Sequence, residues 1–363
     1  NSLGRLKGLL RLRVDYDDGT NETLVTDSSW KLAHGPTTYS GVFGGEDHDA
    51  RLEPLGWTEP GFDDGAWERA LEVTPPTGRL AGLSKAAPPL VVVERRAPVA
   101  ITAPRPGVRV YDLGQNAPYV PRLLIEGERG TTVRLWPAEI LAADGTVDQT
   151  TMRPGKHVSY TLRGGELERW RPPFWYVGSR YWQAEAFGPD GAPLPVEQVL
   201  LDFTGLMVHS SSTPVGTFEC SDELLERIRD LVVWAIRSNL ASVISDCPHR
   251  EKSGWLEQIH LMSSGMAYSF DMAPLFRKTV EDCADAQQAD GMVPTMAPEY
   301  FHYQGGFRDS VEWGGAYVLL PRLMHRWYAD ASLVGRHYEG MRRYLDYLGT
   351  RTQDDILATG LGD

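Results

Sequence analysis

One stretch of sixteen residues, SDCPHREKSGWLEQIH from Ser245 to His260, combines side chains that could carry out chemistry with side chains that would hold them in place. Its carboxyl groups can donate a proton or accept hydrogen bonds from hydroxyl groups, and its indole can stack on the apolar face of a sugar. Pro248 fixes the backbone beside this concentration of charge, which an ordinary surface loop does not require. We therefore interpret the stretch as a reactive or sugar-binding loop. Its candidate side chains are Asp246, Arg250, Glu251, Trp255 and Glu257.

An apolar stripe with helical spacing precedes the loop, and it predicts a largely buried helix. Ser221 is a favourable N-terminal cap for this helix, and Pro248 is expected to end the helical pattern. The stripe consists of Leu224, Ile228, Leu231, Ala235, Leu240, Val243 and Ile244.

The segments after the loop are also predicted to be helical. A nearly all-apolar helix is expected over 256–270, and further helices over 275–289, 311–328 and 333–348. The aromatic-rich segment 291–307 is expected to be a loop. The charged loop would then lie at one end of a pair of helices.

A second group of candidate side chains occurs at the start of the helix predicted over 311–328. Asp309 and Glu312 are three residues apart, so they would share one face if the helix has already begun. Trp313 follows directly. These carboxylates could bind a substrate or could serve the positive end of the helix dipole, and the residues themselves leave both interpretations open.

The first 212 residues have the pattern of β-structure. Leu10, Leu12 and Val14 alternate with charged residues, as in a half-buried strand. Short predicted strands and turn signals recur up to about residue 212, which is typical of β-sandwiches. The acidic, glycine-rich segment 41–57 is expected to be a loop with some binding potential. We divide the chain into a β-sandwich over 1–97, a second β-sandwich over 98–212 and a helical domain over 213–363.

The composition excludes several classes of function. The net charge of −13 argues against nucleic acid as a partner, because phosphate binding needs clustered Lys and Arg. No apolar run approaches the roughly 20 residues of a membrane span. The three cysteines suggest neither a disulfide framework nor a zinc site. Because the chain starts at Asn1, we expect the native N-terminus to be absent, and a cytoplasmic and a secreted location both stay open.

Several separated motifs resemble those of one enzyme family. The loop DCPHREKSGW is similar to the DCPQRDERLGW signature of the inverting α-L-rhamnosidases, glycoside hydrolase family 78. The segment GGEDHDAR, over 44–51, resembles a stretch of that family's N-terminal β-domain. Two further segments, 112–116 and 173–181, also resemble the family, and we interpret them as a turn and a strand. Because the motifs occur in the family's order, the match is more specific than any one of them.

This resemblance implies two β-sandwiches followed by an α/α toroid of the six-hairpin glycosidase type. It implies an inverting hydrolase that releases terminal α-L-rhamnose or a similar deoxy sugar from oligosaccharides, polysaccharides or glycosides. Glu251 would be the general acid and Asp246 a sugar ligand. Arg250 would orient Asp246, bind a hydroxyl group or form a structural ion pair. Trp255 would stack on the sugar or pack in the core, and Glu257 would be a second acid or a hydroxyl ligand.

The chain departs from the family pattern in both groups of candidates. The loop is one residue shorter than the signature, and Gln258 stands where the family has an Asp. The family's WGDA segment is replaced by WGGA over 313–316, so Glu312 or Asp309 would take the place of the missing Asp. Together with Trp313, these two acids are the expected substrate-binding residues of this segment.

The resemblance also implies that part of the catalytic domain lies outside this chain. A toroid needs about a dozen helices of roughly 10–14 residues each, and we expect the chain to end inside it. The family's general base would then lie beyond Asp363, and the fragment alone would be inactive. No organic cofactor is expected, although the acidic loops could supply oxygen ligands to calcium.

Two other functions are compatible with the residues. A polysaccharide lyase on a related toroid would use a His or Tyr base beside a uronate, and its unsaturated product would absorb ultraviolet light. A non-catalytic sugar-binding protein would keep the cleft but have no turnover. Replacement of Glu251 by Gln separates the hydrolase from the binding protein, because only the hydrolase has turnover to lose.

Overall fold

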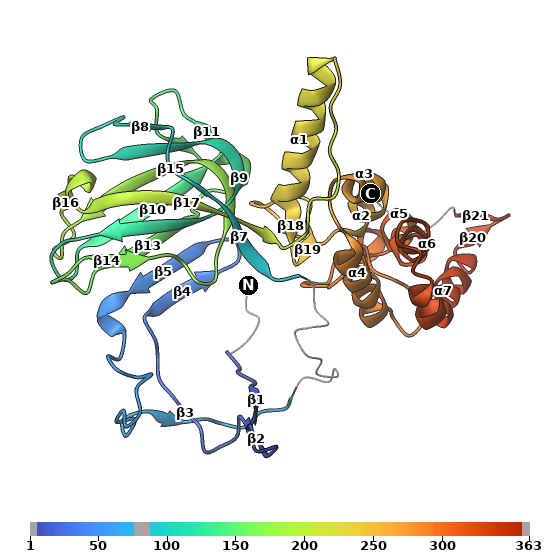
Figure 1. Cartoon of the computed structure of the whole chain (residues 1–363), viewed down its shortest axis with the longest axis horizontal. Helices are drawn as coiled ribbons and strands as arrows, with labels where there is room; N and C mark the ends of the chain where they lie inside the picture. Colours follow the sequence, from blue (N-terminus) through green and yellow to red (C-terminus); the bar gives the residue numbers. More distant parts are fainter. Residues whose placement is uncertain (1–5, 76–87, 358–363) are drawn as a thin grey trace.

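The computed structural model describes residues 6–75 and 88–357 of the chain. Strands dominate the chain as far as Ser210, and helices dominate from Glu223 to Gly349, which agrees with the predicted order of β-structure before helices. In Figure 1 the large sheet lies on the left, and most of the helices lie on the right. Within the described residues, no helix is both long enough and apolar enough to cross a membrane.

A continuous sheet of eleven strands organises the β-rich part of the chain. Its main path runs in the order β4 (Thr37–Gly41), β5 (Gly45–Asp49), β13 (His157–Thr161), β10 (Thr132–Ala138), β15 (Val177–Phe187), β9 (Arg109–Ile125), β17 (Leu200–Ser210) and β7 (Leu90–Arg96). The short strands β8 (Ala100–Thr102) and β14 (Glu168–Trp170) pair with β9, and β16 (Pro193–Leu194) pairs with β15. β13 runs parallel to β5, so β4 and β5 share a sheet with strands that follow them much later in the chain.

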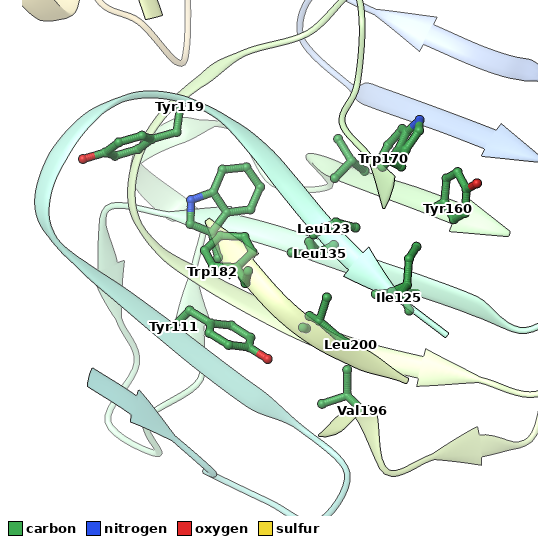
Figure 2. Close-up of a cluster of buried hydrophobic side chains, with 14 of the residues drawn as sticks. Tyr111, Tyr119, Leu123, Ile125, Leu135, Tyr160, Trp170, Trp182, Val196 and Leu200 are labelled. Carbon is green, nitrogen blue, oxygen red and sulfur yellow. The ribbon is translucent and has the colours of Figure 1, made fainter. Parts of the chain in front are cut away.

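The core of this sheet is rich in large aromatic side chains. Figure 2 shows Tyr119 and Trp182 in this cluster, with Leu123 and Leu135 beside them. Alternate residues of β10 face the core, because Val133 and Leu135 are fully buried while their neighbours are partly exposed. Burial of apolar surface contributes about 25 cal/mol per Å² to the free energy of folding, so this core stabilises the sheet.

The segment 112–116, which the sequence predicts to be a turn, lies within β9. Residues 112–116 lie inside this continuous strand, and Gly114 adopts a left-handed φ of 74° there. The carboxylate of Asp112 accepts a hydrogen bond from the Gly114 backbone N–H at 2.7 Å and forms an ion pair with Arg180 at 2.8 Å. The interpretation of this segment as a turn between strands is therefore wrong: the Asp–Gly pair makes an irregularity within one strand.

The N-terminal strands form small ladders outside the large sheet. β1 (Arg11–Asp15) pairs with β2 (Asn21–Val25), and β3 (Lys31–Leu32) pairs with β6 (Glu68–Arg69). The alternating pattern of the sequence therefore predicts β1 correctly. Leu12 is 48% exposed, however, so the expected burial of one face is wrong for the described residues.

The helix before the loop is shorter and more exposed than predicted. α1 (Glu223–Asn239) is capped by the Asp222 carboxylate, which accepts a hydrogen bond from the Leu224 backbone N–H, and not by Ser221. Leu224 is 62% exposed and Leu231 is 70% exposed, so the prediction that this helix is largely buried is wrong. In Figure 1, α1 stands between the sheet and the other helices.

The chain turns sharply between α1 and the loop. β18 (Leu240–Ala241) and β19 (Val243–Ile244) pair across Ser242, which adopts a left-handed φ of 65°. Leu240, Val243 and Ile244 are buried, although they lie in this ladder and not in the predicted continuation of the helix. The tight reversal brings Ser245 back to the end of α1, where its buried N–H donates to the Asn239 carbonyl at 2.9 Å.

The remaining helices pack together around a second apolar core. The bounds are α2 (Leu256–Leu261), α3 (Ser263–Ser269), α4 (Ala273–Ala286), α5 (Val311–Gly314), α6 (Ala316–Tyr328) and α7 (Ser332–Gly349). The helices predicted over 256–270 and 311–328 are each divided into two, whereas those predicted over 275–289 and 333–348 are single helices. Two further small ladders are β11 (Ile140–Leu141) with β12 (Val147–Asp148) and β20 (Thr352–Gln353) with β21 (Ile356–Leu357).

Candidate active site

The signature loop, defined as residues 246–253, leaves the helical part of the molecule between β19 and α2 and returns to it. Two hydrogen bonds of 3.2 Å close its base, from the Asp246 N–H to the Ser253 carbonyl and from the Ser253 N–H to the Asp246 carboxylate. Pro248 and the left-handed Lys252, with a φ of 53°, shape the loop between these ends. The loop is therefore closed at its base by its own hydrogen bonds.

The carboxylate of Glu251 is held by two donors near the C-terminal end of this loop. One oxygen accepts a hydrogen bond from the Arg250 guanidinium at 3.1 Å, and the other accepts one from the Trp255 indole Nε1–H at 3.0 Å. The Glu251 side chain is still 29% exposed. The carboxyl group is therefore both oriented and reachable, as a proton donor to a bound substrate must be.

Asp246 lies close to this acid. Burial and the nearby charge of Glu251 raise the pKa of Asp246, although hydrogen bonds from Cys247 and Ser253 oppose the shift. Arg250 pairs with Glu251 in the described residues and not with Asp246. The loop thus brings two carboxyl groups and one guanidinium together.

Trp255 belongs to an aromatic cluster. Its indole is only 7% exposed, stacks on Tyr303 with the ring centres 5.3 Å apart, and meets the edge of Phe307 at 5.5 Å. Phe301 contacts Tyr303 in turn and is 39% exposed. Trp255 is therefore packed like a core residue, and the aromatic surface open to a ligand comes from the neighbouring segment 300–303.

The second group of candidates lies beyond α2. The Asp309 carboxylate accepts hydrogen bonds from the Tyr347 hydroxyl at 2.5 Å and from Arg351 at 3.2 Å, so it holds the end of α7. Glu312 is exposed and accepts a hydrogen bond from the Ser310 hydroxyl, and its backbone carbonyl lies 2.5 Å from Nε2 of His260 on α2. The side chain of Trp313 packs against the helical core.

The structure brings some of the predicted site residues together and leaves others apart. Asp246, Arg250, Glu251 and Trp255 form one cluster. The side chain of Glu257, on the half-exposed side of α2, has no hydrogen bond or ion pair with other described residues. Asp309 is engaged with α7, so of the second group only Glu312 carries an exposed carboxylate.

Three residues attach the signature loop to the β-rich part of the molecule. The Pro248 carbonyl accepts a hydrogen bond from the Gly178 N–H at 2.9 Å, at the start of β15. His249 Nε2 lies 3.0 Å from the Glu139 carboxylate. The ammonium of Lys252 donates to the Tyr176 carbonyl at 2.6 Å and to the Val42 carbonyl at 2.9 Å.

The contact between His249 and Glu139 is a half-buried ion pair. Burial lowers the pKa of His249, but hydrogen bonds with Cys247 and Glu139 outweigh this effect and raise the pKa to about 9. Burial raises the pKa of Glu139, but hydrogen bonds from His249 and Asn116 bring it down to about 2. Both partners are therefore charged at neutral pH. A cavity of about 250 Å³, lined by Asn116, Glu139, Trp234 and Pro248 among others, lies beside this pair.

The acidic segment near the N-terminus binds protein groups. Glu46 is fully buried and accepts a hydrogen bond from the Phe174 N–H at 3.1 Å, Asp47 accepts one from the Ser159 hydroxyl, and Asp49 pairs with Arg51. Residues 45–49 form β5 and not the predicted loop. In the part of the chain that the structure describes, no three His, Cys, Asp or Glu side chains gather in a way that could hold a metal ion, and calcium binding stays a prediction.

Three residues at the site have no separate signal in the sequence. Glu139 and Val42 are 110 and 210 residues away from their partners in the loop, so only the fold reveals those contacts. Tyr303 lies in a segment rich in aromatics, but nothing in the sequence indicates that it is the one that stacks on Trp255.

Three protein-family models match successive parts of the chain. They are the α-L-rhamnosidase N-terminal domain over residues 2–94, the bacterial α-L-rhamnosidase concanavalin-like domain over 102–209, and the bacterial α-L-rhamnosidase 6 hairpin glycosidase domain over 213–363. These matches confirm the predicted fold class, in which β-sandwiches precede a toroid of helical hairpins.

Relatives of known structure are similar over nearly the whole chain. An α-L-rhamnosidase of Streptomyces avermitilis is 33% identical over 98% of this chain and 34% of its own length. The structure of the enzyme from that organism in complex with L-rhamnose matches with a TM-score of 0.84 at 32% identity, over 95% of this chain and 33% of the other. An α-L-rhamnosidase structure from Dictyoglumus thermophilum matches with a TM-score of 0.89 at 32% identity, over 97% of this chain and 39% of the other. The chain thus spans about a third of the length of the curated relative from Streptomyces.

Proposed function

The chain belongs to the α-L-rhamnosidases, glycoside hydrolase family 78. From this premise we propose that it supplies the general acid of an inverting glycosidase site. The substrate would be a terminal α-L-rhamnosyl group, or a similar deoxy sugar, on an oligosaccharide, polysaccharide or glycoside. We further propose that the domain boundaries fall near residues 97 and 212. The alternatives of a lyase and of a non-catalytic binding protein have no observation in their favour.

Glu251 is the proposed general acid. In an inverting glycosidase one carboxylic acid protonates the leaving oxygen, while a second carboxylate, roughly 6.5–9.5 Å away, activates water on the opposite face of the sugar. The observation that supports this role is the position of Glu251, oriented by Arg250 and Trp255 yet 29% exposed. We assign the role of general base to none of the residues between Asn1 and Asp363.

The neighbouring residues would bind the sugar. Asp246 would accept hydrogen bonds from sugar hydroxyls through the oxygen that Ser253 does not use, and the exposed guanidinium of Arg250 would bind a further hydroxyl. Trp255 would form one wall of the site through the aromatic cluster it anchors. Glu257 and Glu312 are proposed to contact the more distant part of the substrate, and Asp309 and Trp313 are proposed to hold the segment that carries Glu312.

Replacement of Glu251 by Gln in the full-length protein tests the proposal. General acid catalysis contributes typically 10²–10⁴-fold, so turnover of phenyl α-L-rhamnoside, whose leaving group needs protonation, should fall by about that factor while substrate binding persists. NMR of the wild-type reaction should show the inverted anomer as the first product. Glu339→Gln, at an exposed ion pair on α7, is the matched control and should keep full activity. Unchanged turnover in Glu251→Gln would remove the basis of the assignment.

A further inference from the structure

Lys252 is a buried lysine without a carboxylate partner among the described residues. Its ammonium donates to the carbonyls of Tyr176 and Val42 and lies over the Tyr176 ring, 4.5 Å from the ring centre. The residue is 8% exposed. Lysine is almost never buried to this extent unless its charge is matched, so two carbonyl dipoles and an aromatic face take the place of the usual acid.

The backbone of Lys252 adopts a strained conformation. Its φ of 53° lies in the left-handed region, which costs a non-glycine residue on the order of 1–2 kcal/mol. Glycine would adopt this conformation freely, and the chain does place a glycine two residues later, at Gly254. The lysine side chain therefore serves a purpose that offsets the strain.

The Val42 carbonyl lies in a hairpin tip that is held by several hydrogen bonds. Val42, Phe43 and Gly44 form the tip of the β4–β5 hairpin, and each of their carbonyls accepts a hydrogen bond from outside the hairpin. The donors are the Trp175 indole at 3.2 Å and Lys252 for Val42, the Lys156 ammonium at 2.7 Å for Phe43, and the His157 N–H at 3.1 Å for Gly44.

Lys252 also directly follows Glu251 in the chain. Because its side chain is fixed on Val42 and Tyr176 and its backbone is in the left-handed region, the direction in which the preceding residue points is fixed as well. Burial lowers the pKa of Lys252 to about 7, but an amine donates two hydrogen bonds whether or not it carries the extra proton. The anchor therefore does not depend on titration of this residue.

We propose that Lys252 is a positioning residue, which holds the proton donor Glu251 at the glycosidic oxygen by tying the signature loop to the β4–β5 hairpin and to Tyr176. This role rests on the proposed function of Glu251. A displacement of about 1 Å from the reactive geometry can cost roughly 100-fold in rate, so such an anchor would have a measurable effect on proton transfer.

The test uses aryl α-L-rhamnosides of graded leaving-group ability with the full-length protein. Phenol is a poor leaving group that needs the acid, whereas 2,4-dinitrophenol departs without protonation. For Lys252→Met we expect kcat/KM to fall about 100-fold on the phenyl substrate and less than about threefold on the dinitrophenyl substrate. Lys156→Met is the matched control: it removes a second buried lysine that donates to the same hairpin tip, and it should lower Tm without any dependence on the leaving group.

The outcomes separate the two proposals. An equal loss of kcat/KM across the series in Lys252→Met means that Lys252 only stabilises the fold, which overturns the positioning role. Glu251→Gln measured in the same series should show the leaving-group dependence in full, and its absence there would overturn the proposed acid itself. If Lys252→Met does not fold, Lys252→Gly replaces it, because glycine removes the anchor while relieving the left-handed strain. The same selective loss is then expected, and an equal loss again contradicts the proposal.

Discussion

At the scale of single residues, the surroundings of Glu251 determine what its carboxyl group can do. The Trp255 indole and the Arg250 guanidinium each hold one oxygen, and both donors come from the same short segment. Hydrogen bonds to a charged group contribute about 1.5–3 kcal/mol, and a donor that is fixed by packing loses little entropy in forming one. Trp255 is the better fixed of the two, because it is buried against Tyr303 while Arg250 is mostly exposed.

Trp255→Phe should therefore separate packing from hydrogen bonding. Phenylalanine keeps a ring beside Tyr303 but has no N–H for Glu251, so we expect kcat/KM on an aryl α-L-rhamnoside to fall about tenfold with a small change in Tm. Trp170→Phe is the control, because the Trp170 indole N–H has no hydrogen-bond partner in the described part of the chain. A similar loss of activity in both variants would mean that ring volume, and not the indole N–H, is what matters.

The sequence predicts these residues better than it predicts their neighbours. Glu251, Trp255 and Asp246 stand in one recognisable stretch, and the structure does bring them together. Lys252 stands in the same stretch, but its role depends on carbonyl groups, which every residue carries. No pattern of side chains in a sequence can identify an acceptor such as the Val42 carbonyl.

At the scale of elements, local patterns predict where helices and strands occur but not which faces they bury. The period of α1 predicts a helix correctly, yet the packing of the chain leaves its apolar residues Leu224 and Leu231 exposed. Asp112–Asn116 has the composition of a turn, but the pairing of β9 with β15 on both sides of it, up to Asp112 and again from Ala117, makes it an irregularity within one strand. In both cases tertiary contacts decide the result, and those contacts are not encoded locally.

The signature loop should show a pH-dependent attachment through the ion pair of His249 and Glu139. The folded-state pKa of His249, about 9, is above its unfolded value near 6.5, so this contribution is complete below pH 6.5 and is lost as the pH rises through 9. The folded-state pKa of Glu139, about 2, is below its unfolded value near 4.5, so the contribution is complete above pH 4.5 and is lost as the pH falls through 2. The pair therefore contributes most between pH 4.5 and 6.5.

Thermal unfolding of the full-length protein and of Glu139→Gln at pH 5.5, 7.5 and 9.5 checks this expectation. The difference in unfolding free energy between the two proteins should be up to about 3 kcal/mol at pH 5.5 and should shrink towards pH 9.5. Comparison with the variant removes the contributions of Lys252, Lys156 and Cys247, which titrate in both proteins. Glu166→Gln, which breaks the exposed pair with Arg163, should leave Tm nearly unchanged at each pH. A difference that stays constant from pH 5.5 to 9.5 would contradict an ion pair.

At the scale of the whole molecule, the loop that carries the proposed acid is built by one part of the chain and held by another. Its two ends continue into β19 and α2, which belong to the helical part, whereas its outer residues are bound by Gly178, Glu139 and Val42 of the β-rich part. In Figure 1 the loop's neighbours β18 and β19 lie where the sheet and the helices meet. The order of domains follows from the sequence, but this meeting of distant segments does not, because it depends on how two folded cores are placed against each other.

Gly178 is the point at which this arrangement is most sensitive to a small change. A Cβ atom at this position would lie 2.4 Å from Cγ of Pro248 and 3.1 Å from its Cβ, and the proline ring has little freedom to move aside. Gly178→Ala should therefore push the signature loop away from β15. We expect a loss of about 1–3 kcal/mol in the free energy of unfolding from overpacking, and a fall of about 100-fold in kcat from displacement of the acid.

Gly265→Ala is the matched control for this substitution. Gly265 lies within α3 with no other atom within 4 Å of an added Cβ, so alanine should stabilise the protein by up to about 1 kcal/mol and leave kcat unchanged. Both variants add one methyl group to a glycine, so the comparison isolates the contact with Pro248. If Gly178→Ala keeps wild-type kcat at a temperature where it is fully folded, the sheet does not set the position of the loop. The proposed acid would then have to be held by the helical part of the molecule alone.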